Sequence, residues 1–392
     1  MSDPVRAEAI GQEPPLDVPA DEELRLTVLD DYPWHQAAAP LPLPATSDSH
    51  FNDGYYWGFF TAGRFCLFGL RLYPNTNVMD GFGGAVVEGE QRMVRASRAL
   101  RPRVQALEVG PLRLTILEPM RRQRLELGEN PTGIEFDVTI TATSPAFFES
   151  PDIHHRRGRL INHVLRYTQL CRADGTLRVD GREEAVERWY CDRDHSWGIR
   201  SSMGPQIPIR GVEPSRGDPR AIRMWLPFEL DDHCAMFSLH EDSDGNRIDF
   251  DGRIYRRDGR DIDLADVRHS FRYLEGTRRL LGGELTLVTE DGEEHDYEFE
   301  VAGDPWSAQG LGYVRGWQDG GTPGTWRGES HVESDRFVVN DPAEIAGPPH
   351  VPVEKRLGAC EYPIEIRDSS GQSGFAQFEH MVYRPYKPYG LE

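Results

Sequence analysis

The centre of the sequence holds its most chemically distinctive stretch, in which acids and arginines alternate with a histidine and a tryptophan, ERWYCDRDHSWGIR at 187–200. In an extended strand, side chains two residues apart share a face, so Asp192 and Asp194 would point one way and His195 and Trp197 the other. Carboxyl and imidazole groups beside an indole could exchange protons with a ligand in an apolar cavity. Burial raises the pKa of a carboxyl and a nearby cation lowers it, and this balance decides whether Asp194 is a proton donor. We therefore predict Asp194, His195 and Trp197 as catalytic residues.

Two other interpretations of the same stretch remain open. Arg188, Arg193 and Arg200 could pair with Asp192 and Asp194 and so hold a buried turn together, which makes all five supporting residues. Alternatively, the two acids and the adjacent histidine could bind a metal ion, since carboxylates and imidazoles are ordinary ligands. Consecutive ligands on opposite strand faces, with no second histidine cluster at a fixed spacing, argue against that site. We predict no metal.

The elements that must position these residues are predicted to be antiparallel strands. Residues 112–117 and 134–140 alternate apolar and polar side chains, as half-buried strands do. Asp-Gly pairs, the favoured tight hairpin signals, recur along the chain at 174, 180, 244, 251, 258 and 291. Helix signals are few, at residues 91–100 and as a single turn at 342–346. The pattern predicts an all-β fold with few short helices.

A weak internal repeat suggests that one unit is used twice. Two motif pairs are offset by 168 and 173 residues: Trp57-x-x-Phe60 with Trp225-x-x-Phe228, and Gly110-x-Leu112-x-Leu114 with Gly283-x-Leu285-x-Leu287. Chance similarity between amphipathic strands is the alternative explanation. A unit of about 170 residues matches one antiparallel barrel of eight to ten strands. We predict an extended or disordered arm at 1–45, a first barrel at 46–203 and a second at 204–392.

Composition limits the partners. The chain has 392 residues, and 44 Lys and Arg against 65 Asp and Glu give a net charge of −21, which argues against nucleic acid and anionic membrane surfaces. There is no apolar run of transmembrane length, no visible signal peptide and no Cys-x-x-Cys pair among the five scattered cysteines. A cytoplasmic protein is therefore expected. No phosphate-binding glycine loop occurs, so we expect no cofactor.

Several segments resemble the superfamily of carotenoid 1,2-hydratases (hydroxyneurosporene synthases) and AttH-like proteins. They are Tyr167-x-Gln169, Gly175-x-Leu177-x-Val179-Asp180-Gly181, and Arg193-Asp194-His195-Ser196-Trp197-Gly198-x-Arg200. The segments Tyr56-Trp57-x-x-Phe60 and Gly374-Phe375-x-x-Phe378-Glu379 are similar to the first and closing strands of that superfamily. The resemblance spans about residues 50 to 385. It implies two lipocalin-like antiparallel β-barrels packed side by side.

The resemblance also implies a function. His195 and Trp197 match the His-x-Trp that the hydratases need, whereas their downstream Tyr-x-Asp has no match, because Trp225–Asp232 contains acids but no tyrosine. We expect a cofactor-independent enzyme of hydratase, isomerase or cyclase type, acting by acid–base chemistry on a hydrophobic isoprenoid, steroid or polyene. The residues expected to contact that substrate are Tyr56, Trp57, Trp225 and Glu379.

A non-catalytic, lipocalin-like carrier of a small hydrophobic ligand is the alternative function. The two functions differ in what they require of the central stretch. If Asp194 and His195 line a cavity, the enzyme is favoured. If they sit in a closed salt-bridge network, the stretch is a structural lock and the carrier is favoured.

Overall fold

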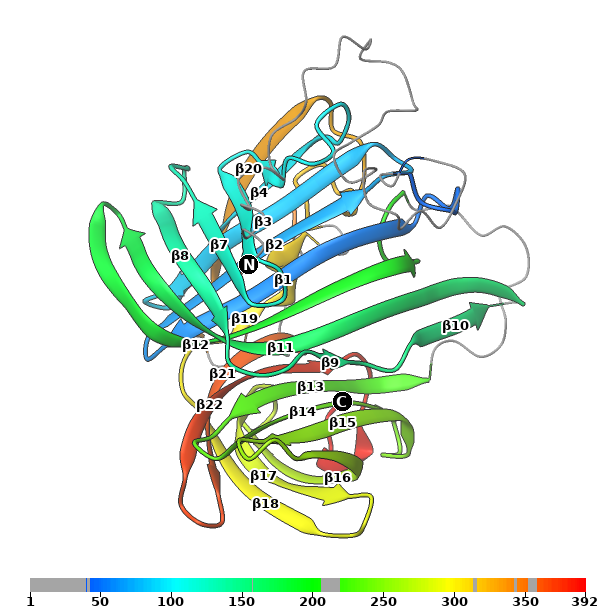
Figure 1. Cartoon of the computed structure of the whole chain (residues 1–392), viewed down its shortest axis with the longest axis vertical. Coiled ribbons are helices and arrows are strands. Elements are labelled where there is room, and N and C mark those ends of the chain that lie inside the picture. Colours follow the sequence, from blue (N-terminus) through cyan, green and yellow to red (C-terminus); the bar gives the residue numbers. More distant parts are fainter. Residues whose placement is uncertain are drawn as a thin grey trace, which may run out of the picture.

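The computed structural model describes residues 40, 43–156, 158–205, 219–312, 316–341, 344–351 and 358–392. Most of the predicted arm at 1–45, and part of the helical turn predicted at 342–346, lie outside these residues. Within them the chain forms two antiparallel sheets, which Figure 1 shows one above the other.

The first sheet is a long, curled array. Its strands run in the spatial order β20-β4-β3-β2-β1-β12-β11-β8-β7-β6-β5, with β9 and β10 also pairing with β11. In chain order they are β1 Phe51–Thr61, β2 Arg64–Tyr73, β3 Val78–Val87, β4 Glu90–Ala99, β5 Glu108–Val109, β6 Leu112–Glu118, β7 Arg122–Leu127, β8 Ile134–Ala142, β9 Phe147–Phe148, β10 Asp152–Arg156, β11 Arg159–Val179, β12 Arg182–Arg200 and β20 Ser330–Val338.

The second sheet closes on itself. Strands β13 to β18 pair in sequence, β22 and β21 follow β13 on its other side, and β21 pairs with β18 to complete the barrel. The bounds are β13 Arg220–Glu229, β14 His233–Asp242, β15 Arg247–Arg256, β16 Asp261–Tyr273, β17 Leu280–Thr289, β18 Glu294–Val301, β19 Trp306–Ser307, β21 Ala359–Asp368 and β22 Ser373–Val382. Two short 3₁₀ turns, η3 Ala308–Leu311 and η4 Lys387–Tyr389, complete the described elements.

The all-β prediction is confirmed, but the helix expected at 91–100 is wrong. That segment is strand β4, and the described part of the chain contains no α-helix. β4 is buried on both faces along most of its length, so its sequence lacks the apolar–polar alternation that marks a half-buried strand. The Asp-Gly hairpin signal at residue 180 is matched by the structure, where Asp180 (φ 49°) and Gly181 (φ 80°) form the tight turn between β11 and β12.

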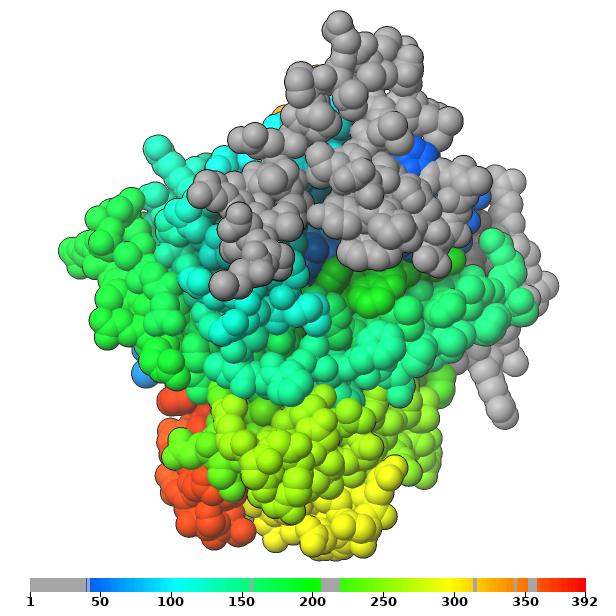
Figure 2. Space-filling model, viewed as in Figure 1, coloured from blue at the N-terminus to red at the C-terminus, as the bar shows by residue number. Residues whose placement is uncertain are grey.

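The two sheets pack through the outer face of the first sheet. Side chains on this outer face belong to the same apolar cluster as Phe228 of the second barrel; they are Phe60, Leu170 and Tyr190. The Tyr190 hydroxyl also donates a hydrogen bond to the Pro227 carbonyl over 2.7 Å. The space-filling view shows the first sheet and the second barrel in contact (Figure 2). Strands β1, β11 and β12 therefore carry the interior of the first sheet on one face and the contact between the sheets on the other.

The two Trp-x-x-Phe motifs of the internal repeat lie on corresponding strands, β1 and β13, but their tryptophans point to opposite faces of the two sheets. Trp57 on β1 belongs to the interior cluster of the first sheet, whereas Trp225 on β13 lies on the outside of the second barrel and bonds to Glu149 of the first. Since side chains alternate along a strand, a shift of one residue moves a motif to the opposite face. Trp57 and Trp225 therefore cannot line one barrel interior each, as a simple duplication would place them.

Strand β20 joins the first sheet although it follows most of the second barrel in the sequence. It pairs with the edge of β4 from Ser330↔Arg98 to Val338↔Glu90. Fully buried Arg95 of β4 donates to Glu333 of β20 over 2.7 and 3.0 Å and also contacts Asp335. The domain boundary predicted near residue 203 stays a prediction. Segment 330–338 comes after that boundary in the sequence but pairs with the first sheet.

Replacing Arg95 with Met should lower the free energy of unfolding by about 3–5 kcal/mol, because Glu333 and Asp335 would stay buried without their cation. The matched control is Arg336→Met on the neighbouring strand β20. Its ion pair with Glu90 (3.4 Å) is half-exposed, so that change should cost less than about 0.5 kcal/mol. Chemical denaturation measures both. Equal effects of the two substitutions would contradict the role assigned to Arg95.

Candidate functional site

The alternation of β12 divides the predicted site residues between two faces. The β1–β12 register runs without a break from Phe51↔Ile199 to Phe60↔Tyr190. His195 and Trp197 therefore share the interior face of the first sheet with Arg193, while Asp194 faces the second barrel. Asp194 and His195 do not meet in one cavity, because no bend reverses the strand between them.

A carboxylate, an imidazole and a phenol meet on the interior face. His195 Nε2 lies 2.7 Å from Asp53 Oδ1, and His195 Nδ1 lies 3.2 Å from the Tyr167 hydroxyl. The Asp53 carboxylate can only accept, so we assign the imidazole proton to Nε2, and Nδ1 accepts from Tyr167. The His195 side chain is 18% exposed. This set is therefore both oriented and accessible.

Aromatic rings surround the imidazole. Tyr55 stacks on His195 at 4.2 Å between ring centroids, and Trp197 meets it edge-on at 5.3 Å. Behind Tyr55 the fully buried Trp57 continues the wall at 5.5 Å. Of the two tryptophans predicted to line the site, Trp197 contacts His195 directly, whereas Trp57 is connected to it only through Tyr55.

Arg193 supports Tyr167. Its guanidinium group lies 5.1 Å from the centroid of the Tyr167 ring and is held by Gln169 Oε1 at 2.8 and 3.0 Å. Burial raises the pKa of Tyr167, and the positive charge of Arg193 opposes that rise. The phenol is thus protonated at neutral pH, with a cation beside it that stabilises a phenolate when one forms.

Sequence reasoning did not assign Asp53, Tyr55 or Tyr167 to the site. Tyr55 and Tyr167 stand directly opposite His195 on the two strands that flank β12, and Asp53 stands opposite Trp197. Only the strand register brings these residues together. Tyr167 stood in a motif that resembles the hydratase superfamily, which was the one available signal.

The other predicted substrate contacts meet at the contact between the sheets. The hydroxyl of Tyr56 bonds to the carboxyl of Glu361, which also accepts from Gln377 Nε2 over 2.7 Å. Burial raises the pKa of Glu361 to about 8, and the negative charges of Glu379 and Asp194 add to the rise. Glu361 is therefore a protonated acid at neutral pH.

Ion pairs fill the rest of this contact. Arg166 Nε lies 3.2 Å from Asp194 Oδ2 and its Nη1 lies 3.4 Å from Glu149 Oε2. Trp225 Nε1 donates to Glu149 over 3.3 Å. Arg166, which sequence analysis did not single out, is thus a partner of Asp194. Asp194 is therefore ion-paired, as one interpretation of the sequence expected, but with Arg166, which is not among the arginines that this interpretation named.

The remaining predicted residues have separate surroundings. Glu379 pairs with Arg223 at 2.8 Å. Burial raises the pKa of Glu379, but the positive charges of Arg223, Arg166 and Arg200 together lower it below its usual value. Fully buried Asp192 bonds to the Tyr190 hydroxyl at 3.1 Å, and burial raises its pKa well above the usual range. Arg188 is exposed where the β11–β12 pairing is irregular, and its backbone N–H bonds to the Asp174 carboxylate over 2.9 Å.

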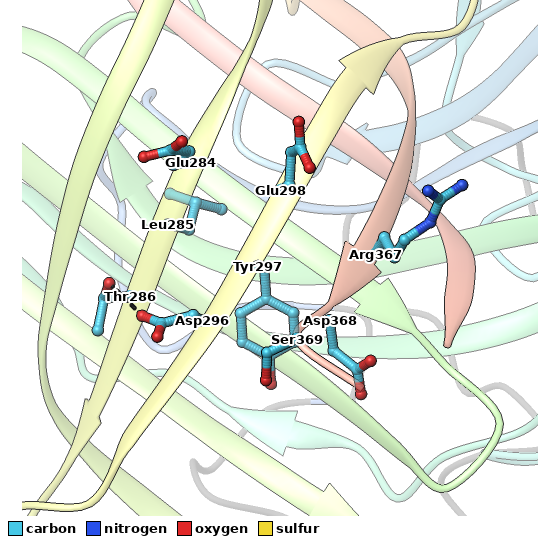
Figure 3. Close-up of a pocket in the computed structure, with 9 residues that line it drawn as sticks. All are labelled: Glu284, Leu285, Thr286, Asp296, Tyr297, Glu298, Arg367, Asp368 and Ser369. Atoms are coloured by element: carbon cyan, nitrogen blue, oxygen red, sulfur yellow. Dashed lines mark hydrogen bonds between the residues drawn. The ribbon is translucent and has the colours of Figure 1, made fainter. Parts of the chain in front are cut away.

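A surface hollow of about 240 Å³ lies elsewhere, on the second barrel (Figure 3). It is lined by Glu284, Leu285, Thr286, Asp296, Tyr297, Glu298, Arg367, Asp368 and Ser369. None of these is a predicted site residue, and the acidic lining does not suit an apolar substrate. In the described residues, no three His, Cys, Asp or Glu side chains are placed to hold a metal ion. Nor does any helix there have the length and apolar character needed to cross a membrane.

Glu361→Gln should change how stability depends on pH. A carboxyl whose pKa is higher in the folded than in the unfolded state stabilises the fold at low pH, and this contribution is lost as pH rises through the folded pKa, here about 8. Wild-type protein should therefore lose about 2–5 kcal/mol between pH 5 and 9, and the variant much less. Denaturant titrations across that range measure the effect. Glu365→Gln, on the exposed side of the same strand, is the control, and equal slopes for all three proteins would contradict the assignment.

Comparison with known proteins supports the fold. No curated protein matches the sequence. Among solved structures, the chain is similar to a Nitrosomonas europaea protein provisionally identified as AttH, at 10% identity over 90% of this chain and 98% of that one, with a TM-score of 0.53. Kievitone hydratase from Nectria haematococca matches at 10% identity over 87% and 93% of the two chains, with a TM-score of 0.43. The first likeness confirms, at the level of fold, the resemblance to AttH-like proteins. The sequence also matches the model of a family of unknown function, DUF8625, over residues 26–392, and the chain belongs to that family.

Proposed function

We propose that the protein is a cofactor-independent enzyme of hydratase type, which adds water to, or removes it from, a hydrophobic substrate. The observation that carries the proposal is the hydrogen-bonded series Asp53–His195–Tyr167. In such a series a carboxylate orients an imidazole, and the imidazole exchanges a proton with a hydroxyl group. A purely structural histidine does not need both partners on an accessible interior face.

The residues can perform hydration without an external acid or base. Tyr167 donates its proton to one carbon of an alkene while water bonds to the other carbon. The proton that water loses passes to His195 Nδ1 and from there to the Tyr167 phenolate, so both groups end as they began. Asp53 stabilises the imidazolium that forms in between, and Arg193 stabilises the phenolate. Dehydration follows the same steps in reverse.

The walls of the site support an apolar substrate. The rings of Tyr55 and Trp197 contact the imidazole, and Trp57 stacks on Tyr55 behind them. The π-faces of Tyr55 and Trp197 stabilise positive charge on a carbon skeleton during proton transfer. Phe148, which is 58% exposed, stacks on Trp197 at 6.5 Å and extends this apolar surface outward. An isoprenoid, steroid or polyene fits these features. The resemblance to carotenoid hydratases in the His-x-Trp segment points to the same class.

A carrier of a hydrophobic ligand is the second candidate. The observation that favours it is the ion-paired state of Asp194, which makes half of the central stretch structural. A carrier would use the same aromatic wall but would have no need of Tyr167 as a proton donor. The two functions can therefore be separated by experiment.

Native mass spectrometry of protein expressed in its source organism should identify a retained hydrophobic ligand. Incubation of that ligand with the protein in ¹⁸O-labelled water should then incorporate the label. Tyr167→Phe and His195→Ala should each reduce incorporation by about 10²–10⁴-fold, because each removes one proton-transfer group. Thermal stability should change little. Tyr383→Phe and His154→Ala, outside the site, serve as controls. If a ligand is retained but neither the wild-type protein nor any variant incorporates the label into it, the hydratase function is contradicted and the carrier function is supported.

A further inference from the structure

The wall of the second barrel opens between two neighbouring strands. In the described residues β15 and β16 pair only at Arg253↔Asp263, Ile254↔Ile262 and Tyr255↔Asp261. β16 then continues to Tyr273 with pairing to β17 on its other side. Beyond Asp263, the edge of β16 that faces β15 therefore offers backbone groups to any segment that comes close.

The C-terminal segment Tyr386–Leu391 occupies this opening, and Figure 1 draws it in red beside β16. The hydroxyl of Tyr389 accepts from the backbone N–H of Phe271 over 3.1 Å and lies 3.0 Å from the carbonyl oxygen of His269. The same hydroxyl lies 2.6 Å from His269 Nδ1. The phenol thus contacts both backbone and side-chain groups at the edge of β16, and its single proton can go either to the His269 carbonyl or to His269 Nδ1.

The barrel behind Tyr389 is lined by aromatic rings and holds one unsatisfied polar atom. Tyr389 stacks on Phe271 at 5.6 Å and meets Tyr273 at 5.3 Å. The Tyr273 hydroxyl bonds to His380 Nε2 over 2.9 Å, and His380 is fully buried. Burial lowers the pKa of His380 to about 3, so the ring is neutral. Its Nδ1 has no hydrogen-bond partner among the described residues, and such an atom can serve a polar group of a ligand.

The polar groups around Tyr389 repeat the order found in the first sheet. Glu241 Oε2 lies 3.3 Å from His269 Nε2, and His269 Nδ1 meets the Tyr389 hydroxyl. A carboxylate on Nε2 and a phenol on Nδ1 is also the arrangement at His195. In the second barrel, however, the phenol comes from the C-terminal segment rather than from a strand of the wall.

We propose that the second barrel contains a second ligand site, specific for a planar aromatic compound that carries a hydroxyl group, and that Tyr389 is its intramolecular occupant. A ligand of this class can place its hydroxyl where the Tyr389 hydroxyl lies and its ring against Phe271. Tyr386 at the start of the segment is buried and bonds to Glu241. The turn that follows is held at the surface, where Lys387 N–H donates to the Ser243 carbonyl over 3.0 Å and the exposed Lys387 ammonium group pairs with Asp244. In this proposal Tyr389 is displaced while Tyr386 stays in place. The site is independent of the hydratase function proposed above.

Binding of 2-naphthol, followed by its fluorescence, tests the proposal. Tyr389→Phe keeps the ring but loses the hydroxyl contacts, so the C-terminal segment competes less well and the affinity for 2-naphthol should rise about tenfold. Asp244→Ala, which weakens the anchorage from outside, should raise it about two- to threefold. Naphthalene, which has no hydroxyl to take the place of the Tyr389 hydroxyl, should bind more weakly than 2-naphthol in the wild-type protein and in both variants. Tyr383→Phe is the matched control and should leave the affinity unchanged.

Hydrogen exchange gives a second measure on the unaltered chain, where saturating 2-naphthol should speed exchange in peptides covering residues 386–391. The proposal is overturned if Tyr389→Phe and Asp244→Ala leave the affinity unchanged, if naphthalene binds as tightly as 2-naphthol, or if exchange at 386–391 is unaffected. Loss of all 2-naphthol binding in His195→Ala would also overturn it, because the probe would then occupy the first sheet.

Discussion

The alternation of side chains along strand β12 decides which residues face the interior of the first sheet and which face the second barrel. β12 is part of the wall of the first sheet and also part of its contact with the second barrel, so neighbouring residues on it have different surroundings. His195 belongs to an accessible acid–base series, and Asp194, the next residue back along the chain, belongs to a network of ion pairs. A deletion or insertion of one residue in β12 would exchange these two roles.

The two faces treat buried charge in different ways. On the interior face, a single carboxylate, Asp53, stands next to the imidazole and reaches solvent. Between the sheets, several carboxyl groups share a small buried volume. Asp194 and Glu379 pair with arginines, whereas burial raises the pKa values of Asp192 and Glu361. Neutralising some acids and pairing others is how a strongly acidic chain can bury carboxyl groups where two sheets meet.

Sequence patterns were sufficient for the fold class and for part of the site. Hairpin signals and alternation predicted antiparallel strands, and the strand period correctly grouped His195 with Trp197. The pattern failed where both faces are buried, as at β4, which carries no alternation. It also could not identify Asp53 and Tyr167 as partners of His195, because those contacts depend on strand register over separations of 142 and 28 residues. Likewise, the tandem tryptophans looked equivalent, and only the opposite phase of β1 and β13 separates Trp57 from Trp225.

The late position of β20 in the sequence has a consequence for synthesis on the ribosome. The edge of β4 finds its partner strand in Ser330–Val338, and the same strand carries Glu333 and Asp335, the carboxylates that pair with buried Arg95. Before that segment emerges, the strands of the first sheet and most of those of the second barrel have already left the ribosome. While the second barrel is being synthesised, the edge of β4 is therefore unpaired and Arg95 lacks its carboxylate partners. A nascent chain in that state is exposed to edge-to-edge association. Folding in this protein is completed from the far end of the chain rather than one barrel at a time.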